Sequence, residues 1–445
     1  MPTIHGDSSD NILSGGSEDD LIQGFGGHDE LSGGDGDDLL IGGTGEDYFR
    51  GGRGSDRFVG SAPGVDADES DRVFHHIDAG VTQGVDVDLA LGRGTDGWGY
   101  QDIYEDIYRV TGTRLDDTIR GDDEDNSFSG MAGDDLLDGR GGWDFVRYAD
   151  ATGGVVVDLG AGTASGAEGN DTLVSIEGVG GSNFSDRIFG SDRTDVEEWF
   201  YLDDFGNELT PNYQVEADDV LDGRGGLDGV AYDQNTARVR INLEKDRATD
   251  ASGHVDTLLN VEMARGSQAG DKITGAEHEA NRLFGSGGND QILGLSGRDY
   301  LNGSFGNDKL HGDKGKDELL GGAGDDKLWG GTARDVLEGG KGADAFIFTT
   351  PKDSGPSLKS SDRIEDFIRG DDRIVLTRID ATTGAPGNQD FELDRGGPFE
   401  AGEIRQHRVQ AGLRVEINLD DDARAEMSIL LMGLSGRLGA SDFEF

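Results

Sequence analysis

The sequence predicts an all-β fold: an interrupted parallel β-solenoid with β-rich spacers and a C-terminal β cap. A nine-residue unit, G-G-x-G-x-D-x-U-x with U an apolar residue, recurs in four blocks along the chain. Glycine supplies 77 of the 445 residues and proline only 7, as expected for many tight turns between very short strands. The chain has 91 acidic and 39 basic residues, and this imbalance indicates that the fold includes bound cations.

Composition excludes several classes of protein. A net charge of −52 with 33% hydrophobic residues is typical of chains that stay disordered unless something cationic offsets the self-repulsion. The same charge excludes nucleic acid as a partner and argues against an anionic membrane surface. The absence of cysteine excludes disulfides, thiol catalysis and cysteine-ligated zinc. No stretch approaches the ~18 apolar residues of a membrane span, and the start MPTIHGDSSD predicts no cleavable signal peptide.

The repeat units form four blocks. Six units fill 6–59, four fill 112–147, three lie at 181–189 and 214–231, and nine fill 266–347, where GAEHEANRLF has ten residues. The sixth position is Asp in 19 of the 22 units and Asn in the other three, Asn11, Asn126 and Asn281. The eighth position is apolar in all 22. A flexible Gly/Asp linker is the alternative, but it has no reason to place an apolar side chain at every eighth position.

Each unit predicts a turn followed by a strand. The glycine-rich half is a tight turn, because glycine adopts positive φ without a steric penalty. The x-U-x half is a short strand that points U to one face and its neighbours to the other. Two units therefore make one coil, coils stack with parallel pairing, and the U residues meet inside. One apolar residue in nine is a thin core, which needs further stabilisation.

Stacked turns predict a metal site. The turns of unit n and unit n+2 meet at one edge, and each brings an Asp carboxylate and several unobstructed carbonyls. Such an all-oxygen cage suits Ca²⁺, with Mg²⁺ the weaker candidate because it needs stricter octahedral geometry. Zn²⁺ would require His or Cys ligands. The free energy of calcium binding would then contribute directly to folding.

The unit resembles the RTX (repeats-in-toxin) nonapeptide, whose family fold is the calcium-bound parallel β-roll. The resemblance implies that each ion takes the carbonyls of positions 2 and 4 and the Asp of one turn, with the carbonyls of positions 1 and 3 and the Asp of the turn two units on. One ion would then bind Gly34, Gly36 and Asp38, facing Gly51, Arg53 and Asp56. Another would bind Ser304, Gly306 and Asp308, facing Gly321, Ala323 and Asp326. Glu18 and Leu115 replace the fourth glycine and Gln214 the first, so those turns are expected to bind poorly.

Applied to every unit, the resemblance implies a long set of candidate calcium ligands. Besides the residues just named, they are Gly16, Asp20, Gly27, Asp29, Gly33, Gly42, Gly43, Gly45, Asp47, Asp117, Gly133, Asp135, Gly142, Asp144, Asp186, Asp219, Asp228, Asp271, Gly288, Asp290, Gly297, Asp299, Gly303, Gly312, Gly315, Asp317, Gly322, Gly324, Gly330, Asp335, Gly339 and Asp344.

The segments between the blocks resemble one another. VVVDLGAGTASGAEGNDTLVSIEGVGGS (155–182) parallels VRINLEKDRATDASGHVDTLLNVEMARGS (239–267), and 85–113 is a third version. We interpret them as a β-rich continuation of the solenoid. The alternative is a sugar-binding platform built from exposed aromatic residues in two clusters: Trp98, Tyr100, Tyr104 and Tyr108, and Trp199, Phe200, Tyr201, Phe205 and Tyr213.

The tail after Phe348 resembles the C-terminal region of serralysin-type secreted metalloproteases, through GADAFIF and SDRIEDFIRGDDRIVL. The resemblance implies that this region caps the solenoid and precedes a type I secretion signal, and that Asp353 and Asp362 complete the last calcium sites. The segment ending in SDFEF fits such an uncleaved signal. We predict RTX β-rolls at 6–59, 112–147, 181–231 (with an insertion at 190–213) and 266–348, β-rich spacers at 60–111, 148–180 and 232–265, and the cap with its signal at 349–445.

No catalytic motif accompanies the repeats. None of the eight His forms H-E-x-x-H, and no G-x-S-x-G is present. The one cluster worth naming, His75 and His76 beside Asp71, is interpreted as a solvated loop. We therefore expect a secreted, extracellular and non-enzymatic protein that binds several Ca²⁺, with calcium and the type I secretion machinery as partners and a surface, matrix or accessory role. The alternative is a secreted protein that binds or acts on polysaccharide through the spacers.

Overall fold

The computed structural model describes residues 1–61, 71–75, 80–193, 197–201, 218–233, 235–382, 389–394, 396–420 and 422–445. These residues form an almost entirely β structure without an α-helix, so the predicted all-β class is confirmed. Its two short 3₁₀-helices are η1 (Leu243–Lys245) and η2 (Ala440–Asp442). The chain divides into two compact units, unit 1 at Met1–Asp228 and unit 2 at Gly229–Phe445. No helix in the described ranges has the length and apolar character needed to cross a bilayer.

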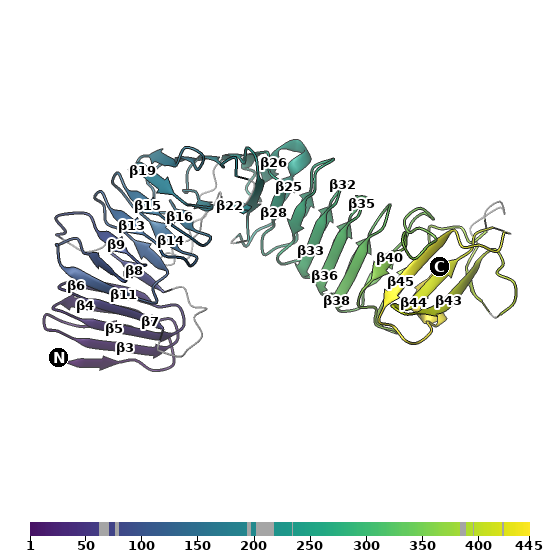
Figure 1. Cartoon of the computed structure of the whole chain (residues 1–445), viewed down its shortest axis with the longest axis horizontal. Helices are drawn as coiled ribbons and strands as arrows, with labels where there is room; N and C mark the ends of the chain where they lie inside the picture. Colours follow the sequence, from purple (N-terminus) through teal and green to yellow (C-terminus); the bar gives the residue numbers. More distant parts are fainter. Residues whose placement is uncertain are drawn as a thin grey trace. The chain divides into compact units, whose positions relative to one another are not determined.

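Unit 1 consists of stacked coils whose strands alternate between two sheets (Figure 1). In spatial order, sheet A contains β1 (Thr3–His5), β3 (Leu21–Gly26), β5 (Leu39–Thr44), β7 (Arg57–Ser61), β11 (Gln101–Glu105), β10 (Arg93–Thr95), β9 (Asp86–Asp88), β13 (Thr118–Arg120), β15 (Leu136–Asp138), β19 (Gly169–Val174), β18 (Thr163–Gly166), β17 (Val156–Asp158), β21 (Arg187–Phe189) and β23 (Val220–Asp222). Sheet B is parallel throughout and contains β2 (Ile12–Ser14), β4 (Glu30–Asp35), β6 (Tyr48–Arg53), β8 (Arg72–Phe74), β12 (Arg109–Thr111), β14 (Ser127–Ser129), β16 (Phe145–Arg147), β20 (Gly178–Gly180) and β22 (Glu197–Tyr201).

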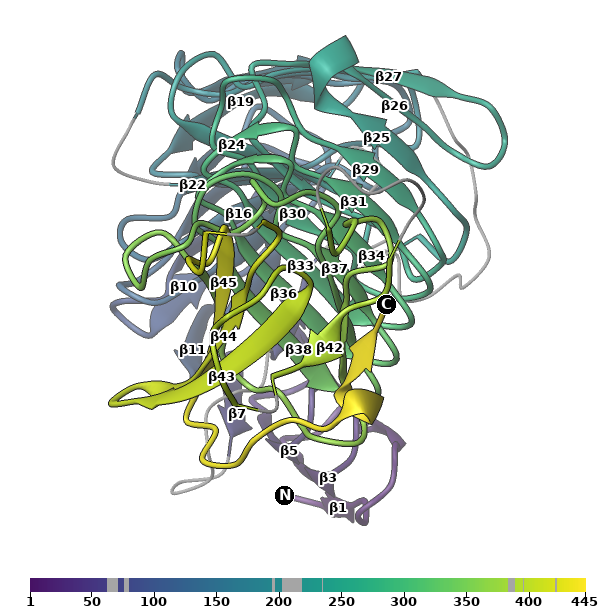
Figure 2. The same cartoon turned by 90° about the vertical axis from the view of Figure 1, so that its right-hand side faces the viewer.

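Unit 2 repeats the two-sheet arrangement, and its strands are seen side by side in Figure 2. Sheet A here contains β27 (Val255–Leu259), β26 (Arg247–Thr249), β25 (Arg240–Asn242), β29 (Lys272–Thr274), β31 (Gln291–Leu293), β34 (Lys309–His311), β37 (Lys327–Trp329), β39 (Ala345–Ile347), β41 (Arg373–Val375) and β46 (Phe443–Glu444). Sheet B contains β24 (Leu227–Ala231), β28 (Met263–Arg265), β30 (Arg282–Phe284), β33 (Tyr300–Phe305), β36 (Glu318–Ala323), β38 (Val336–Lys341), β40 (Asp362–Ile364), β45 (Met427–Met432), β44 (Gly412–Ile417), β43 (Glu403–Val409) and β42 (Glu392–Leu393). Two strands of two residues each, β32 (Ser296–Gly297) and β35 (Lys314–Gly315), pair in parallel and join neighbouring turns.

The core is a line of eighth-position side chains, as predicted. In sheet A, Ile22 pairs with Leu40 and Leu40 with Phe58, so each lies directly above its equivalent one coil earlier. All three are fully buried, and so are Leu31 and Phe49 on the opposing sheet. Because each coil adds one such residue per sheet, the core remains only one side chain deep on each side.

The three spacers adopt one arrangement, a three-stranded antiparallel meander within sheet A. In the first, β9 and β10 pair antiparallel, as do β10 and β11. The last strand, β11, then pairs in parallel with β7 of the preceding block, and the first strand, β9, with β13 of the following block. The spacer thus enters the sheet in reversed order while the parallel stack continues on both sides of it.

The C-terminal segment extends sheet B. β45 pairs in parallel with β40, and β44 and β43 follow as antiparallel neighbours. Met427, Ile429 and Leu431 of β45 are fully buried, as are Val415 and Ile417 of β44. This apolar layer covers the end of the roll, which is the structural role of the predicted cap.

Candidate metal centre

Aspartates at the sixth position of successive repeats form hydrogen-bonded ladders along the turns. The backbone N–H of Asp20 donates to Oδ1 of Asp38 at 2.7 Å, and that of Asp38 to Oδ1 of Asp56 at 2.9 Å. In unit 2 the N–H of Asp290 donates to Asp308 at 2.7 Å and the N–H of Asp308 to Asp326 at 2.8 Å. Each coil has two turns, so each roll carries two such ladders, one on each edge.

The second carboxylate oxygen of these ladder residues is buried without a hydrogen-bond partner. This holds for Oδ2 of Asp29, Asp38, Asp56, Asp135, Asp144, Asp290, Asp299, Asp308, Asp317, Asp326, Asp335, Asp344 and Asp362, and for Oδ1 of Asp20. Buried polar atoms are nearly always bonded, and a buried carboxylate oxygen without a partner carries a large desolvation cost. A cation bound beside these rows of oxygens would compensate for the missing hydrogen bonds.

Burial raises the pKa of the ladder carboxyl groups. The pKa of Asp56 rises to about 7 and that of Asp290 to about 8, first because burial penalises the charged form and then because neighbouring aspartates repel it. Burial raises the pKa of Asp308 to about 6, and the hydrogen bond from the N–H of Asp290 opposes this rise. A divalent cation placed among these oxygens would reverse the balance by favouring the ionised form.

The first glycine of each repeat shows how closely the oxygens converge. A Cβ added to Gly33 would lie 2.2 Å from Oδ2 of Asp38 and 2.6 Å from the carbonyl oxygen of Gly51, one coil on. At Gly303 the corresponding distances are 2.3 Å to Asp308 and 2.6 Å to the carbonyl of Gly321. A carboxylate oxygen and a carbonyl oxygen thus share the space that a side chain would fill. Only glycine leaves room for both, and all-oxygen sets of this kind suit Ca²⁺.

The structure brings together the two ligand sets that the repeat resemblance implies. The N–H of Gly36 donates to the carbonyl of Arg53 at 2.8 Å, which places the first set of turns in contact. In the second set the N–H of Gly306 donates to the carbonyl of Ala323, also at 2.8 Å. A carbonyl oxygen has two lone pairs, so these hydrogen bonds leave one lone pair for a metal. The assignment of these residues as ligands stays a prediction.

The first aspartate after each spacer differs from the others. Asp271 accepts hydrogen bonds from the N–H and the hydroxyl of Ser267 at 2.5 and 2.9 Å, and from the N–H of Val239 at 2.7 Å. Asp117 accepts the equivalent hydrogen bonds from Thr113 and from the N–H of Val85. Asp186 accepts them from Ser182 and from the N–H of Val155. In these three units a hydroxyl residue replaces the second glycine and bonds the aspartate of its own unit, so the three predicted ligands have both carboxylate oxygens occupied.

The other end of a ladder lies in a spacer residue that the repeat pattern does not identify. Asp56 donates its N–H to Asp102 at 2.9 Å, and Asp135 donates to Asp171 at 3.1 Å. The remaining oxygen of Asp171 accepts the hydroxyl of Tyr148 at 2.9 Å. In unit 2 the hydroxyl of Tyr232 likewise donates to Asp256 at 2.6 Å. In these spacers a hydroxyl group therefore bonds the second carboxylate oxygen, which inside the rolls has no hydrogen-bond partner.

A shorter signal would have identified these spacer residues. Asp102, Asp171 and Asp256 each precede a buried apolar or aromatic residue by two positions, as the repeat aspartates do. The acidic-x-apolar half of the unit is retained while the glycine turn is lost. The full nine-residue pattern therefore misses strands that continue the same ladder.

The remaining predicted ligands fall into two groups. Asp362 lies in the ladder, since it accepts the N–H of Asp335 at 2.9 Å, whereas both oxygens of Asp353 are held by Thr349 and Thr350. Asp219 is buried and accepts the N–H of Asp186 at 2.7 Å. The expected weak unit at Gln214 lies outside the described residues.

The aromatic residues of the spacers do not form one exposed platform. Tyr104 is 3% exposed and Phe200 is fully buried, while Tyr100 is 43% exposed. Phe205, Tyr213 and the Tyr201 side chain lie outside the described part. Tyr104 also lies 3.1 Å from Nε2 of His75, which is itself buried, so the solvated-loop interpretation is wrong for that histidine. His76 lies outside the described residues.

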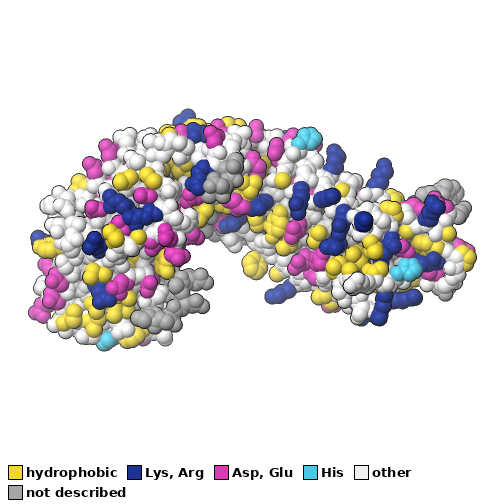
Figure 3. Space-filling view, in the orientation of Figure 1, with side chains coloured by type: hydrophobic (Ala, Val, Ile, Leu, Met, Phe, Trp, Pro, Cys, Tyr) yellow, Lys and Arg dark blue, Asp and Glu magenta, His cyan; other side chains and the backbone are white. Residues whose placement is uncertain are grey.

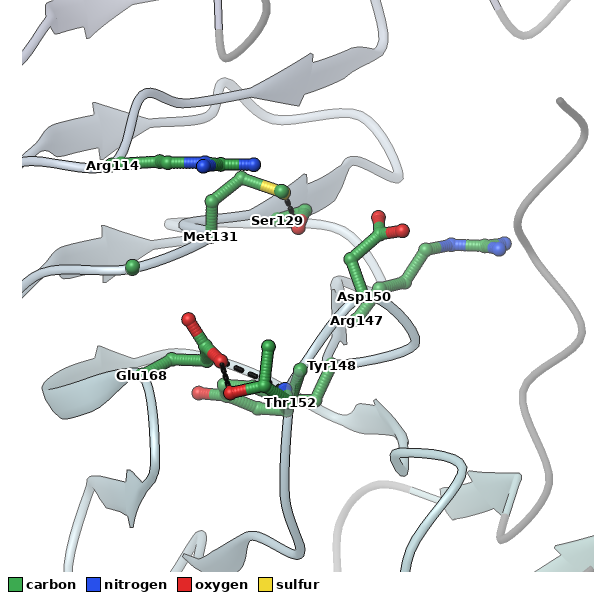
Figure 4. A pocket seen from close by; sticks show the side chains of 10 residues that line it. Arg114, Ser129, Met131, Arg147, Tyr148, Asp150, Thr152 and Glu168 are labelled. Carbon is green, nitrogen blue, oxygen red and sulfur yellow. Dashed lines mark hydrogen bonds between the residues drawn. The ribbon is translucent and has the colours of Figure 1, made fainter. Parts of the chain in front are cut away.

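A small cavity lies beside the second spacer (Figure 4). Its volume is about 160 Å³, and Arg114 and Met131 face Thr152 and Glu168 across it. Glu168 accepts the N–H of Thr152 at 2.7 Å, which ties one wall together. Sites for small molecules typically enclose roughly 300–1,000 Å³, so this cavity is smaller than such sites.

Comparison with known proteins gives two family matches. The family model described as Peptidase M10 serralysin C terminal matches residues 218–444. The model described as RTX calcium-binding nonapeptide repeat (4 copies) matches residues 5–40, 32–62 and 111–146. These matches confirm both resemblances that the sequence predicted. No curated protein matches the chain.

Two solved structures are similar over part of the chain. The AlgE6R3 subunit of the Azotobacter vinelandii mannuronan C5-epimerase is 26% identical, over 40% of this chain and 80% of that one, with a TM-score of 0.22. The extracellular lipase LipA from Serratia marcescens is 14% identical, over 74% of this chain, with a TM-score of 0.18. This chain spans only 40% of the lipase. Scores this low place no constraint on the site.

Proposed function

Because the chain belongs to the family of the serralysin C-terminal domain and carries RTX calcium-binding repeats, we propose that it is a secreted protein that folds outside the cell on binding several Ca²⁺. Its role would be at a surface, in a matrix, or as an accessory to other secreted proteins. Neither the serralysin C-terminal domain nor the RTX repeat is catalytic, and we propose that the chain has no enzymatic activity of its own.

The buried carboxylate oxygens without partners carry this proposal. Inside the rolls, ladder residues such as Asp38, Asp56, Asp308 and Asp326 satisfy one oxygen within the protein and leave the other buried and open. A chain of net charge −52 cannot keep these carboxylates ionised in a thin core without a cation. Calcium is therefore required for the fold itself, and its binding free energy supplies much of the folding free energy.

Calcium-dependent folding is tested by circular dichroism of the full chain. In excess chelator the strand signal is expected to disappear, and millimolar calcium should restore it. Magnesium at the same concentration is the matched control for ionic strength and charge, and it should restore little, because it prefers strict octahedral geometry. A strand spectrum that stays unchanged in chelator would contradict calcium-driven folding.

Export is tested separately. If the cap region directs type I secretion, removing 386–445 should retain the protein inside a host that has a working type I exporter. Removing the first block, 6–59, should leave export unchanged, since the repeats are unfolded and threadable at low cytosolic calcium. Secretion that persists without 386–445 would contradict the export proposal and leave the calcium result intact.

A further inference from the structure

Sheet A of unit 2 carries a row of basic side chains on its outer face. The seventh position of a repeat points away from the buried eighth position, so it lies on the outside of the sheet. Seven neighbouring strands, from β25 to β41, align these positions in direct register. Five of them, β25, β29, β31, β34 and β37, are labelled in Figure 2. The aligned residues, called the cation row below, are Arg240, Lys272, Gln291, Lys309, Lys327, Ala345 and Arg373. Five of the seven are basic, along about 29 Å at the ~4.8 Å spacing of adjacent strands.

Most of these cations have no ionic partner. Arg240, Lys272, Lys309 and Lys327 are exposed, and within the described ranges no carboxylate lies at ion-pair distance from any of them. Arg373 has Glu444 at 3.9 Å. Lys309 is directly opposite Lys327, and like charges in that arrangement destabilise a sheet. Folding gains nothing from this placement, although the chain has 91 acidic residues with which to neutralise it.

Unit 1 shows the ordinary solution on the equivalent face. There Arg57 of β7 pairs with Glu105 of β11 at 2.8 Å, and Arg120 of β13 pairs with Asp86 of β9 at 2.8 Å. Basic and acidic side chains lie next to one another over much of the surface seen in Figure 3. Arg187 of β21 is exposed and lacks an ion pair within the described ranges, but it is aligned with Val156 and Val220, so it has no basic neighbour across the strands. The row of aligned basic residues is thus a local feature of unit 2.

An apolar and aromatic row runs beside the cation row. The ninth positions of the same strands include Leu293, His311 and Trp329, again in direct register. The rings of His311 and Trp329 stack with centroids 4.1 Å apart and planes 7° from parallel. Both side chains are half-buried, so the pair forms a firm, flat surface next to Lys309 and Lys327. A flat ring next to a cation suits a partner that has both an apolar face and a negative charge.

We propose that the cation row and the adjacent His311–Trp329 pair form a binding strip for an extended acidic polysaccharide whose sugar rings carry carboxylates. The strip is linear and at most two side chains wide, which fits a single extended chain better than a membrane surface. Its basic residues lie one or two strands apart, about 5–10 Å, far sparser than the phosphates of duplex DNA at one per ~1.7 Å. The strip lies on the sheet face, separate from the turns at the edges where the calcium ladders run.

Calorimetric titration of the calcium-loaded full chain tests the strip, with a galacturonic acid hexamer as the probe. The unmodified chain is expected to bind the hexamer, with an affinity that falls as salt is added. Lys327→Glu places an acid opposite Lys309, an arrangement that favours the sheet, so the thermal midpoint should stay equal or rise. Affinity for the hexamer should nevertheless fall at least tenfold. A Lys309→Gln/Lys327→Gln double variant should show the same loss without a charge reversal.

Lys316→Glu is the matched control, with the same charge change at an exposed turn position of the same roll. Other units carry an acid at that position, for example Asp325, so the turn tolerates it. This variant should keep the affinity of the unmodified chain. Equal losses in both variants, no binding of the hexamer, equal binding of a neutral glucose hexamer, or tighter binding of duplex DNA or phosphatidylglycerol vesicles would each overturn the proposal.

Discussion

The repeat aspartate uses its two carboxylate oxygens differently. In Asp308, Oδ1 accepts the N–H of Asp290 and so sets the spacing between coils, while Oδ2 remains buried without a partner. The glycine at position 1 makes this possible, because a Cβ at Gly303 would collide with Oδ2. One residue type thus serves both the backbone ladder and the candidate ion site, and these two functions can be separated by substitution.

Asp308→Asn should separate them. The amide oxygen still accepts the N–H of Asp290, but the negative charge beside the ion is lost. We expect calcium affinity in 266–347 to fall by at least tenfold, about 1.4 kcal/mol, with strand content restored at higher calcium. Hydrogen exchange at graded calcium concentrations measures this locally. Asp313→Asn, at an exposed turn position of the same roll, is the control with the same charge change and should alter little. Loss of protection in 6–59 would contradict a local effect.

The spacers end one ladder and begin the next with hydroxyl groups. Tyr148 and Tyr232 donate to the last carboxylate of a ladder, and Ser182 and Ser267 donate to the first carboxylate of the following one. Each such bond satisfies a carboxylate oxygen at the point where a meander interrupts the stack. We propose that calcium sites are confined to the ladder interiors, and that the spacers join the rolls without a bound ion.

The Tyr148→Phe substitution tests how much this hydroxyl contributes to the free energy of unfolding. The change leaves a buried oxygen of Asp171 without a donor, a loss that typically costs about 1–3 kcal/mol. Denaturant unfolding of the calcium-loaded chain should show this destabilisation, while the number of bound calcium ions stays the same. Tyr100→Phe, at an exposed tyrosine of unit 1, is the control and should leave the unfolding free energy unchanged. A rise in bound calcium without destabilisation would contradict the capping role.

The metal-free chain as a whole should respond to pH in the opposite direction to most proteins. The pKa values of buried ladder residues such as Asp56 and Asp290 are raised to about 7 and about 8 in the folded chain, against ~3.9 when unfolded. Between those values the folded chain binds more protons, so its unfolding free energy falls as pH rises.

This predicts that residual strand structure in calcium-free buffer is greatest near pH 4 and disappears as the pH rises toward 8. In calcium the trend is reversed, because protons compete with the ion and affinity increases with pH. Circular dichroism across this range, with and without calcium, measures both trends. Stability that increases with pH in calcium-free buffer would show that the ladder carboxylates are not buried as described.

The sequence alone determined the all-β class, the parallel coils and the chemistry of the turns. This was possible because each repeat contacts its equivalent one coil away, so a local pattern specifies the neighbours of most residues. Leu40 beneath Phe58, and Asp38 beside Asp56, follow from the spacing of the units. The assignment of individual ligands and the division into four rolls remain predictions.

Only the tertiary structure decided which oxygens remain open and where the ladders end. The reversed order of β9, β10 and β11 brings Asp102 beside Asp56, although they are far apart in sequence and Asp102 belongs to no repeat. The alignment of Lys272 with Lys309 likewise crosses the ten-residue unit, whose extra residue is absorbed in a turn. Such contacts depend on which strands pair across an irregular segment. That choice is made by packing and hydrogen bonding throughout the sheet, because the local pattern of the repeat does not extend into the spacer.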